Sequence, residues 1–247
     1  MMSSEDKSSA VPAGTSVITP VITPVITPVI TIDGPSGCGK GTIAAKLAER
    51  LGWHLLDSGA LYRGLGHAAM AAGVDLDDGE ALGQLAGRLD LRFAGQRLLL
   101  EGDDISSAIR TETAAAAASR VARHAPVRAA MLDWQRNAVR PPGLVADGRD
   151  MGTVVFASAP LKFYLDASLK ERANRRYKQL NDKGVDANLV DLTDDLRERD
   201  QRDQQRALSP LVAADDAVVM DTTRMSIDAV FNSVMDAVRR SLPWLIT

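Results

Sequence analysis

The chain has 247 residues, of which 45% are hydrophobic, and a formal net charge of −3. This length suits one sizeable core with inserted lobes rather than several independent domains, and the negative charge gives no bulk attraction for DNA or RNA. The single cysteine, Cys38, excludes an intramolecular disulfide and a cysteine-rich zinc site. The N-terminus is polar and no apolar run is long enough to span a membrane. We therefore expect a cytoplasmic protein with no nucleic-acid and no membrane partner.

The first 28 residues contain a short repeat. The motif VITP occurs three times from Val17 onwards, and a fourth copy that begins at Val29 has Ile32 where proline is due. Proline at every fourth residue removes backbone donors, which excludes a helix or a central strand. The repeat is either a proline-containing docking arm or a duplication that leaves a loose tail, and the lack of a known peptide-binding pattern favours the tail. We predict that residues 1–28 are a disordered arm in front of a domain of residues 29–247.

From Val29 onwards, short apolar runs alternate with helical stretches. Five candidate strands each end at an aspartate, namely 29–33 (Asp33), 54–56 (Asp57), 144–146 (Asp147), 161–165 (Asp166) and 217–220 (Asp221). Continuous apolar runs between helices are typical of a parallel sheet with helices on both faces. Ligands of such sheets bind beyond the carboxyl ends of the strands. The sequence therefore predicts an α/β fold with a five-stranded parallel sheet and a binding site near these aspartates.

Two stretches interrupt this alternation. Residues 58–140 form an insertion in which 89–100 alternates around Ala94-Gly95, which predicts a β-hairpin. Residues 171–210 are helical in pattern, highly charged and poor in apolar residues, which suits a mobile lid better than a core element. We expect a core made of residues 29–57, 141–170 and 211–247, with the insertion 58–140 and the lid 171–210 between its segments.

A glycine-rich loop follows the first strand and opens a helix predicted at 42–51. Its residues are Gly34, Pro35, Ser36, Gly37, Cys38, Gly39, Lys40, Gly41 and Thr42. This context predicts a phosphate-binding loop, because the glycines let backbone N–H groups converge on phosphate oxygens while Lys40 and the helix dipole add positive charge. Thr42 is the candidate Mg²⁺ ligand. Cys38 is either an activated thiol or a small residue that fills the loop.

The loop pattern GxxGxGKGT, with glycine after the lysine, resembles nucleoside monophosphate kinases rather than GTPases or motor ATPases. Together with LLDSGALYR (55–63), ADGRDMGTVVF (146–156) and RERDQRDQQRALSPL (197–211), it is similar to the bacterial cytidylate kinase family. The motifs occur in the expected order, and the resemblance extends from Val29 to the C-terminal region. It implies a P-loop NTPase core and transfer of the γ-phosphate of ATP, with Mg²⁺, to CMP or dCMP in pyrimidine metabolism. We expect the enzyme to be a monomer.

The same resemblance assigns roles to single residues. It implies that Arg63, Arg149 and Arg206 bind the acceptor phosphate, and that Arg199 and Asp203 meet the ribose. Ser119, Arg128 and Asp150 match the cytosine-binding positions, with Arg110 in the same lobe as a further candidate. Ser58 and Tyr62, beside Arg63, and Asp147 complete the substrate-binding set. The candidate catalytic residues are Lys40, Asp147, Arg149, Arg175 and Arg176.

The spacing of the arginines in the predicted lid carries its own signal. Arg199, Arg202 and Arg206 follow at i, i+3 and i+7, and Arg172, Arg175 and Arg176 follow at i, i+3 and i+4. Each set therefore shares a helix face. Three cations on one face repel one another unless an anion arrives. We expect the lid to bring Arg175 and Arg176 onto the transferred phosphoryl group.

Three other functions stay open at this point. A kinase for another monophosphate, UMP or AMP, would keep the phosphate-binding residues and change the base pocket. A P-loop GTPase switch needs the guanine-reading pattern N-K-x-D, which the chain lacks. A nucleic-acid-stimulated ATPase needs a basic or aromatic strand-binding surface, which the net charge disfavours.

Overall fold

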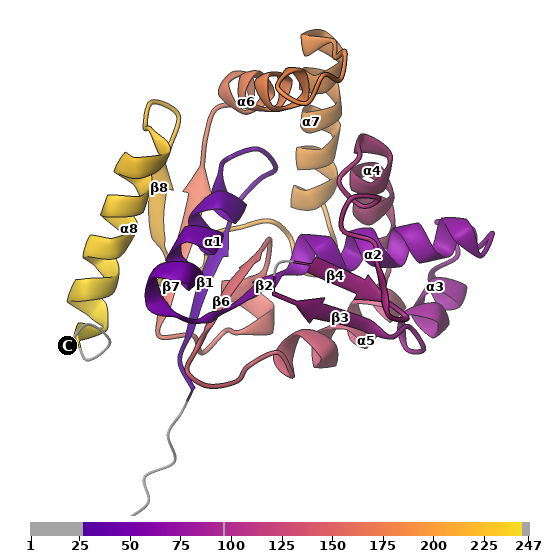
Figure 1. The fold of residues 1–247 in the computed structure, drawn as a ribbon, viewed down its shortest axis with the longest axis horizontal. Helices are drawn as coiled ribbons and strands as arrows, with labels where there is room; N and C mark the ends of the chain where they lie inside the picture. The colour runs from indigo at the N-terminus through magenta and orange to yellow at the C-terminus, as the bar shows by residue number, and fades with distance from the viewer. Residues whose placement is uncertain (1–26, 96, 244–247) are drawn as a thin grey trace, which may run out of the picture.

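The fold was analysed in a computed structural model, which describes residues 27–95 and 97–243 (Figure 1). Its centre is a five-stranded sheet in which all neighbouring strands are parallel, in the order β2-β6-β1-β7-β8. The strands are β1 (Val29–Asp33), β2 (His54–Asp57), β6 (Leu144–Gly148), β7 (Leu161–Asp166) and β8 (Val218–Asp221). The predicted α/β fold with five parallel strands is thus confirmed. Apart from residues 27 and 28, the predicted arm lies outside the described residues.

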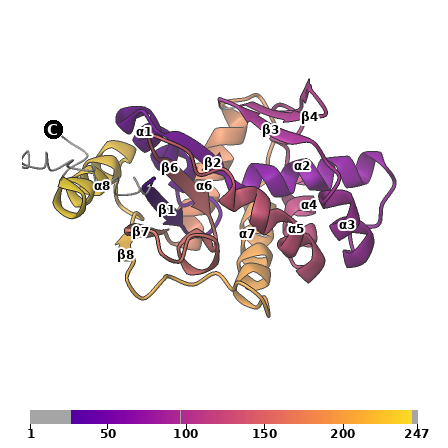
Figure 2. The same ribbon diagram turned by 90° about the horizontal axis from the view of Figure 1, so that it is seen from below.

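The apolar strands build a core on each face of the sheet, because successive side chains of a strand point to opposite faces. Ile30 and Ile32 of β1 pack with Val145 of β6 in the cluster that includes α1 (Lys40–Leu51) and α8 (Ile227–Ser241). Leu144 and Ala146 of β6 belong to the opposite cluster, which α2 (Ser58–Ala71) covers. In both views α1 and α8 lie side by side (Figures 1 and 2). The central strands are therefore buried on both faces, as their continuous apolar runs predict.

The residues between β2 and β6 form a second lobe. It consists of α2, α3 (Gly79–Ala86), β3 (Leu91–Ala94), β4 (Arg97–Leu100), β5 (Asp103–Asp104), α4 (Glu112–Val121) and α5 (Ala125–Arg136). The predicted hairpin is confirmed as the antiparallel pair β3 and β4. The third strand, β5, was not predicted, because two residues are too short for any alternation. Helix α4 packs on α2 and α5 packs on α3, so this lobe is continuous with the sheet through α2.

The charged segment before β8 is helical, as predicted, and consists of the packed helices α6 (Leu169–Asn181) and α7 (Leu189–Gln204). Both helices lie above the carboxyl ends of the strands, with α7 beside α4 (Figure 1). The prediction that Arg206 shares a helix face with Arg199 and Arg202 is wrong, because α7 ends at Gln204. The backbone N–H of Leu211 donates to the Asp203 carbonyl at 2.9 Å, which turns the chain back toward the sheet.

None of the helices within the described residues is long and apolar enough to cross a membrane.

A chain that begins at Thr27 is expected to keep its melting temperature and its turnover. The reason is that the carbonyl of Pro28 accepts from the Leu144 N–H at 3.0 Å and extends the pairing of β1 with β6 by one residue. A cut after residue 26 preserves this hydrogen bond. Thermal melts and activity assays of the full chain and of residues 27–247 test the expectation, and a lower melting temperature of the shorter chain would show that the repeat packs on the domain.

Candidate active site

The glycine-rich loop lies at the carboxyl end of β1 and leads directly into α1. Gly34 has φ of 149°, and a Cβ there would lie 2.0 Å from the Leu165 carbonyl oxygen of β7, so only glycine fits. Lys40, the first residue of α1, is buried and donates from Nζ to the Pro35 carbonyl at 3.0 Å. Burial and the charge of Arg149 lower the pKa of Lys40. The loop therefore holds a buried cation at a helix N-terminus, where an anion is favoured.

The glycine after Lys40 departs from the common P-loop pattern, and its surroundings explain why. A Cβ on Gly41 would lie 3.1 Å from Oδ2 of Asp147, the aspartate at the end of β6. A larger residue would push this carboxylate away from the loop. Thr42, one position later, lines the cavity beside the loop. The structure thus brings Lys40, Thr42 and Asp147 to one place.

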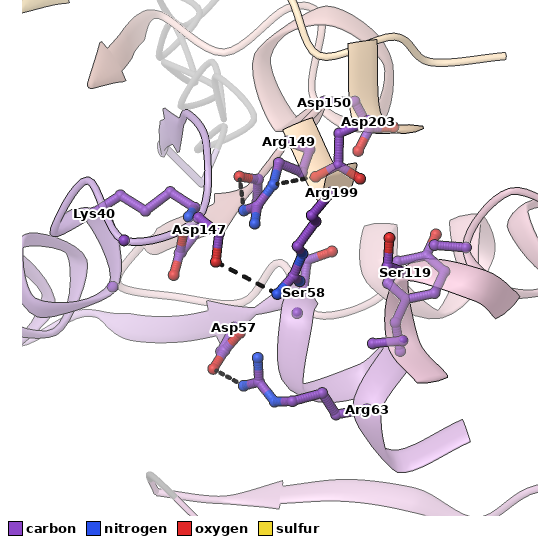
Figure 3. A pocket seen from close by; sticks show the side chains of 18 of the residues that line it. Lys40, Asp57, Ser58, Arg63, Ser119, Asp147, Arg149, Asp150, Arg199 and Asp203 are labelled. Atoms are coloured by element: carbon purple, nitrogen blue, oxygen red, sulfur yellow. Dashed lines mark hydrogen bonds and ion pairs between the residues drawn. The ribbon is translucent and has the colours of Figure 1, made fainter. Parts of the chain in front are cut away.

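A cavity of about 320 Å³ opens beside this loop, between the ends of β2 and β6, helices α2 and α4, and the lid helix α7 (Figure 3). Six basic side chains and four carboxylates line it. The predicted site residues among the lining are Ser36, Gly37, Gly39, Lys40, Gly41, Thr42, Ser58, Tyr62, Arg63, Ser119, Arg128, Asp147, Arg149, Asp150, Arg199, Asp203 and Arg206. The excess of cations over carboxylates favours an anionic ligand.

Several buried polar atoms of the cavity lining have no hydrogen-bond partner within residues 27–95 and 97–243. They are Arg63 Nε, Ser119 Oγ, Asp147 Oδ1, Arg199 Nε and Arg206 Nε. Buried polar groups in folded proteins are nearly always hydrogen-bonded. The orphaned atoms include donors and acceptors and come from the sheet, from helices α2 and α4 of the second lobe, and from the lid. A polar ligand in this cavity could satisfy them.

One end of the cavity contains a buried ion pair. Asp150 is 3% exposed, and its Oδ2 accepts from Nη2 of Arg128 on α5. The Arg128 guanidinium also lies 6.0 Å from the centroid of the Tyr62 ring. Ser58, another predicted site residue, accepts at Oγ from Gln135 Nε2 at 3.0 Å. This end offers a carboxylate, a guanidinium and the free hydroxyl of Ser119 to a ligand.

Three further arginines of the cavity, Arg63, Arg149 and Arg206, are held by carboxylates; Figure 3 labels Arg63 with Asp57 and Arg149 with Asp203. Arg149 Nε donates to Asp203 Oδ2 at 3.0 Å, and Arg206 donates to the other Asp203 oxygen. Arg63 Nη2 donates to Asp57 Oδ2 at 2.9 Å.

Burial and neighbouring charges together shift the pKa values of the charged side chains in this cavity. Burial alone would lower the pKa of Arg149, but the carboxylates of Asp203 and Asp147 raise it above its ordinary value. Burial would raise the pKa of Asp203, yet Arg149 and Arg206 hold it below its usual range. Burial raises the pKa of Asp147 to about 6 against the charge of Lys40. Asp203 therefore holds Arg149 and Arg206 in fixed directions before any ligand arrives. Arg199 pairs with no carboxylate of the described residues, and burial lowers its pKa to about 10.

Only two of the five strand-end aspartates, Asp57 and Asp147, line this cavity. Asp166 accepts at Oδ1 from the Ala167 N–H at 2.8 Å, and Asp221 accepts from the Thr223 N–H at 2.8 Å. Asp33 accepts from the Met151 and Gly152 N–H groups. The expectation of a binding site near all five aspartates is thus corrected. Asp33, Asp166 and Asp221 accept instead from backbone amides of the loops that follow the strands.

Four predicted site residues line a neighbouring cavity of about 1030 Å³ instead, namely Cys38, Arg110, Arg175 and Arg176. Gly34 and Pro35 are not among the residues that line either of these two cavities. Cys38 is 2% exposed and belongs to the α1 core cluster, which favours a filling role over a reactive thiol. The larger cavity lies between the P-loop, the lid and the start of α8.

Each arginine of the first lid set pairs with a carboxylate. Arg172 donates to Asp200 at 2.5 Å, Arg175 Nε donates to Glu171 at 2.9 Å, and Arg176 Nε donates to Glu112 of α4 at 2.7 Å. The predicted repulsion is thus relieved by one carboxylate for each arginine. In addition, Arg175 Nη1 donates to the Cys38 carbonyl of the P-loop at 3.2 Å. The lid is therefore tied to the loop and to the second lobe.

Sequence reasoning missed several lining residues, namely Gly59, Ala118, Ala122 and Gln179, and gave Asp57 and Gly148 no role of their own. Gln179 follows Arg175 by four residues and Arg176 by three, so helical spacing alone could have placed it on their face. The small residues carry no such signal, because a glycine or alanine lines a cavity only through its place in the fold.

The chain is similar to several known proteins. The family model described as "Cytidylate kinase" matches residues 30–240. The chain is 56% identical over 210 residues to a "Cytidylate kinase" of Pseudomonas aeruginosa (strain LESB58), which covers 83% of this chain and 92% of the relative. It is 55% identical over 214 residues to that of Azotobacter vinelandii (strain DJ / ATCC BAA-1303), covering 84% and 93%. A solved structure, TT1252 from Thermus thermophilus, is 17% identical with a TM-score of 0.46 over 87% of this chain and 98% of that chain.

Proposed function

Because this chain belongs to the cytidylate kinase family, we propose that it transfers the γ-phosphate of ATP to CMP or dCMP, giving ADP and CDP or dCDP. The observation that carries the proposal is the cavity beside the P-loop. It combines arginines near the loop with a buried pair of Asp150 and Arg128 at the other end. This arrangement suits a ligand with a phosphate and a base that both donates and accepts hydrogen bonds.

The two cavities meet at the P-loop, which suggests where each substrate binds. The residues that line both are Ser36, Gly37, Gly39, Thr42, Arg63, Gln179 and Arg199. We place ATP in the larger cavity and CMP in the smaller one, so that their phosphates converge at these shared residues. Phosphoryl transfer needs little covalent chemistry from the protein, and rate enhancement comes from in-line positioning and charge neutralisation.

The acceptor phosphate is bound by Arg63, Arg149 and Arg206 in this proposal. Asp57 and Asp203 hold these arginines in place, so little rotamer freedom remains to be lost when the phosphate binds. The ribose lies near Arg199 and Asp203 of α7. The cytosine lies between Ser119, Arg128 and Asp150, where Arg128 donates to ring acceptors and Asp150 accepts from the amino group.

The residues near Lys40 also fit Mg²⁺. Thr42 and Asp147 would hold it, since Asp147 Oδ1 is buried without a partner in the described part of the chain and Mg²⁺ commonly takes one or two protein oxygens together with phosphates and water. When bound, Mg²⁺ neutralises charge on the phosphate oxygens. Lys40 stabilises the negative charge on the transferred group, and Arg175 and Arg176 turn inward from their present partners.

We also propose a division of labour among the segments. Residues 58–140 act as the CMP-binding lobe, since α2, α4 and α5 carry Arg63, Ser119 and Arg128. Residues 171–210 act as the lid, whose closure excludes water that would otherwise hydrolyse ATP. We expect a monomeric enzyme, and we place it with its nucleotide substrates in the cytoplasm.

A coupled assay for ADP release tests the function. The enzyme is expected to convert CMP and dCMP much faster than UMP or AMP, because uracil presents a carbonyl to Asp150, while adenine is larger and lacks the O2 acceptor that cytosine offers to Arg128. A higher rate with UMP or AMP would identify a different monophosphate kinase. ADP release that needs no monophosphate but responds to nucleic acid would identify an ATPase, and nucleotide binding without transfer would identify a switch protein.

A further inference from the structure

Asp150 occupies an unusual position for a residue that faces a ligand cavity. It is the N-cap of a short π-helix, η1 (Met151–Val155), yet its side chain makes no capping hydrogen bond. An aspartate at an N-cap ordinarily accepts from one of the first backbone N–H groups of the helix. Here the Asp150 carboxylate turns away from η1 and pairs with Arg128. Another group has to satisfy the first amides of η1.

Asp33 performs this capping from the neighbouring strand. It lies at the end of β1 and is 4% exposed. Its Oδ1 accepts from the Met151 N–H at 2.9 Å, and its Oδ2 accepts from the Gly152 N–H at 2.8 Å. The fit is tight, because a Cβ on Gly152 would lie 2.8 Å from Thr31 Oγ1 and 3.4 Å from Asp33 Oδ2. Asp33 is not among the residues that line the cavity.

We propose that Asp33 is a positioning residue for base selectivity: it caps η1 in place of Asp150 and thereby leaves the Asp150 carboxylate to pair with Arg128 and read the base. This inference rests on the proposed function. The chemistry requires such a division, because a carboxylate that bonds the η1 amides cannot also point across the cavity to Arg128. Asp33 keeps this role although burial raises its pKa to about 7, with the two amides acting in the opposite direction.

The variant Asp33→Asn tests the inference. Asparagine has the same size, but one oxygen becomes an NH₂ group that cannot accept from an amide. One η1 amide is then unsatisfied, and we expect the carboxylate of Asp150, the N-cap residue of η1, to accept from it. We expect the KM for CMP to rise and the CMP/UMP ratio of kcat/KM to narrow, each by about threefold to tenfold, the size of one hydrogen bond. The KM for ATP should stay unchanged.

Two further variants separate positioning from a general structural effect. In an Asp150→Asn background, adding Asp33→Asn is expected to narrow the CMP/UMP ratio no further. The Asp150 carboxylate, which Asp33 leaves available to the base in the wild type, is already absent there. Asp78→Asn removes a capping carboxylate from α3, where Asp78 accepts from the Ala81 N–H at 3.0 Å. This control variant should keep the wild-type ratio.

If Asp33→Asn does not fold, Gly152→Ala displaces the same amide from Asp33 and is expected to narrow the ratio in the same way. The inference is overturned if the folded variant loses CMP and UMP turnover equally. It is also overturned if the ratio narrows further in the Asp150→Asn background. A wild-type enzyme without any preference for CMP would instead refute the proposed function, so the two failures are distinguishable.

Discussion

Replacing Lys40 with alanine is expected to reduce phosphoryl transfer by at least about a hundredfold, the effect of removing one preorganised stabilising group. Lys40 is the first residue of α1 and lies where the P-loop and the end of β6 meet. In the proposed function its charge acts on the transferred phosphoryl group, where negative charge accumulates in the transition state. Arg63 and Arg149 are already bonded to Asp57 and Asp203, so we expect neither to replace it.

The fold should tolerate this change. The only side-chain hydrogen bond of Lys40 within the described residues runs from Nζ to the Pro35 carbonyl at 3.0 Å. Because burial and Arg149 lower the pKa of Lys40, the charged lysine is unfavourable in the absence of substrate. We therefore expect the melting temperature of the variant without nucleotide to be unchanged or raised, a trade-off that is common at functional sites.

A second lysine on α1 provides the matched control. Lys46 is exposed and pairs with Asp228 at 3.0 Å. Lys46→Ala removes the same side chain from the same helix but lies away from the loop, so its turnover should equal that of the wild type. Near-normal turnover of the Lys40 variant, measured beside this control, would contradict the assignment of the phosphate-binding loop.

The sequence predicted the sheet and the P-loop well because both depend on local signals. The run Val29–Asp33 is apolar and β-branched, and it is followed at once by glycines that allow close backbone approach. The partners of the arginines could not be predicted in the same way. Arg149 and Asp203 lie 54 residues apart, and Arg176 and Glu112 lie 64 apart, so only the packing of the lobes reveals these pairs. The capping of η1 by Asp33 was missed for the same reason.

The variant Asp150→Asn is expected to lower kcat/KM for CMP by a factor that corresponds to about 1–3 kcal/mol, the value of one good base contact. Cytosine presents an amino donor at position 4, which a carboxylate accepts, whereas uracil presents a carbonyl that a carboxylate repels. Asparagine keeps the size, removes the charge and supplies an amide donor that uracil can use. UMP should therefore lose less or even gain, and the CMP/UMP ratio should narrow by roughly tenfold to a hundredfold.

A competing role for Asp150 is to orient Arg149 for the acceptor phosphate. The geometry disfavours it, because Arg149 Nε bonds Asp203 at 3.0 Å and its Nη1 bonds the Gly148 carbonyl at 3.2 Å, whereas Asp150 bonds Arg128. Asp203→Asn is the matched control. It loosens Arg149 and Arg206, which in the proposed function bind the phosphate that both substrates share, so CMP and UMP should lose efficiency together. Steady-state kinetics of both variants with both monophosphates decides the question. If Asp150→Asn leaves the CMP/UMP ratio unchanged, as the Asp203 variant should, Asp150 does not read the base.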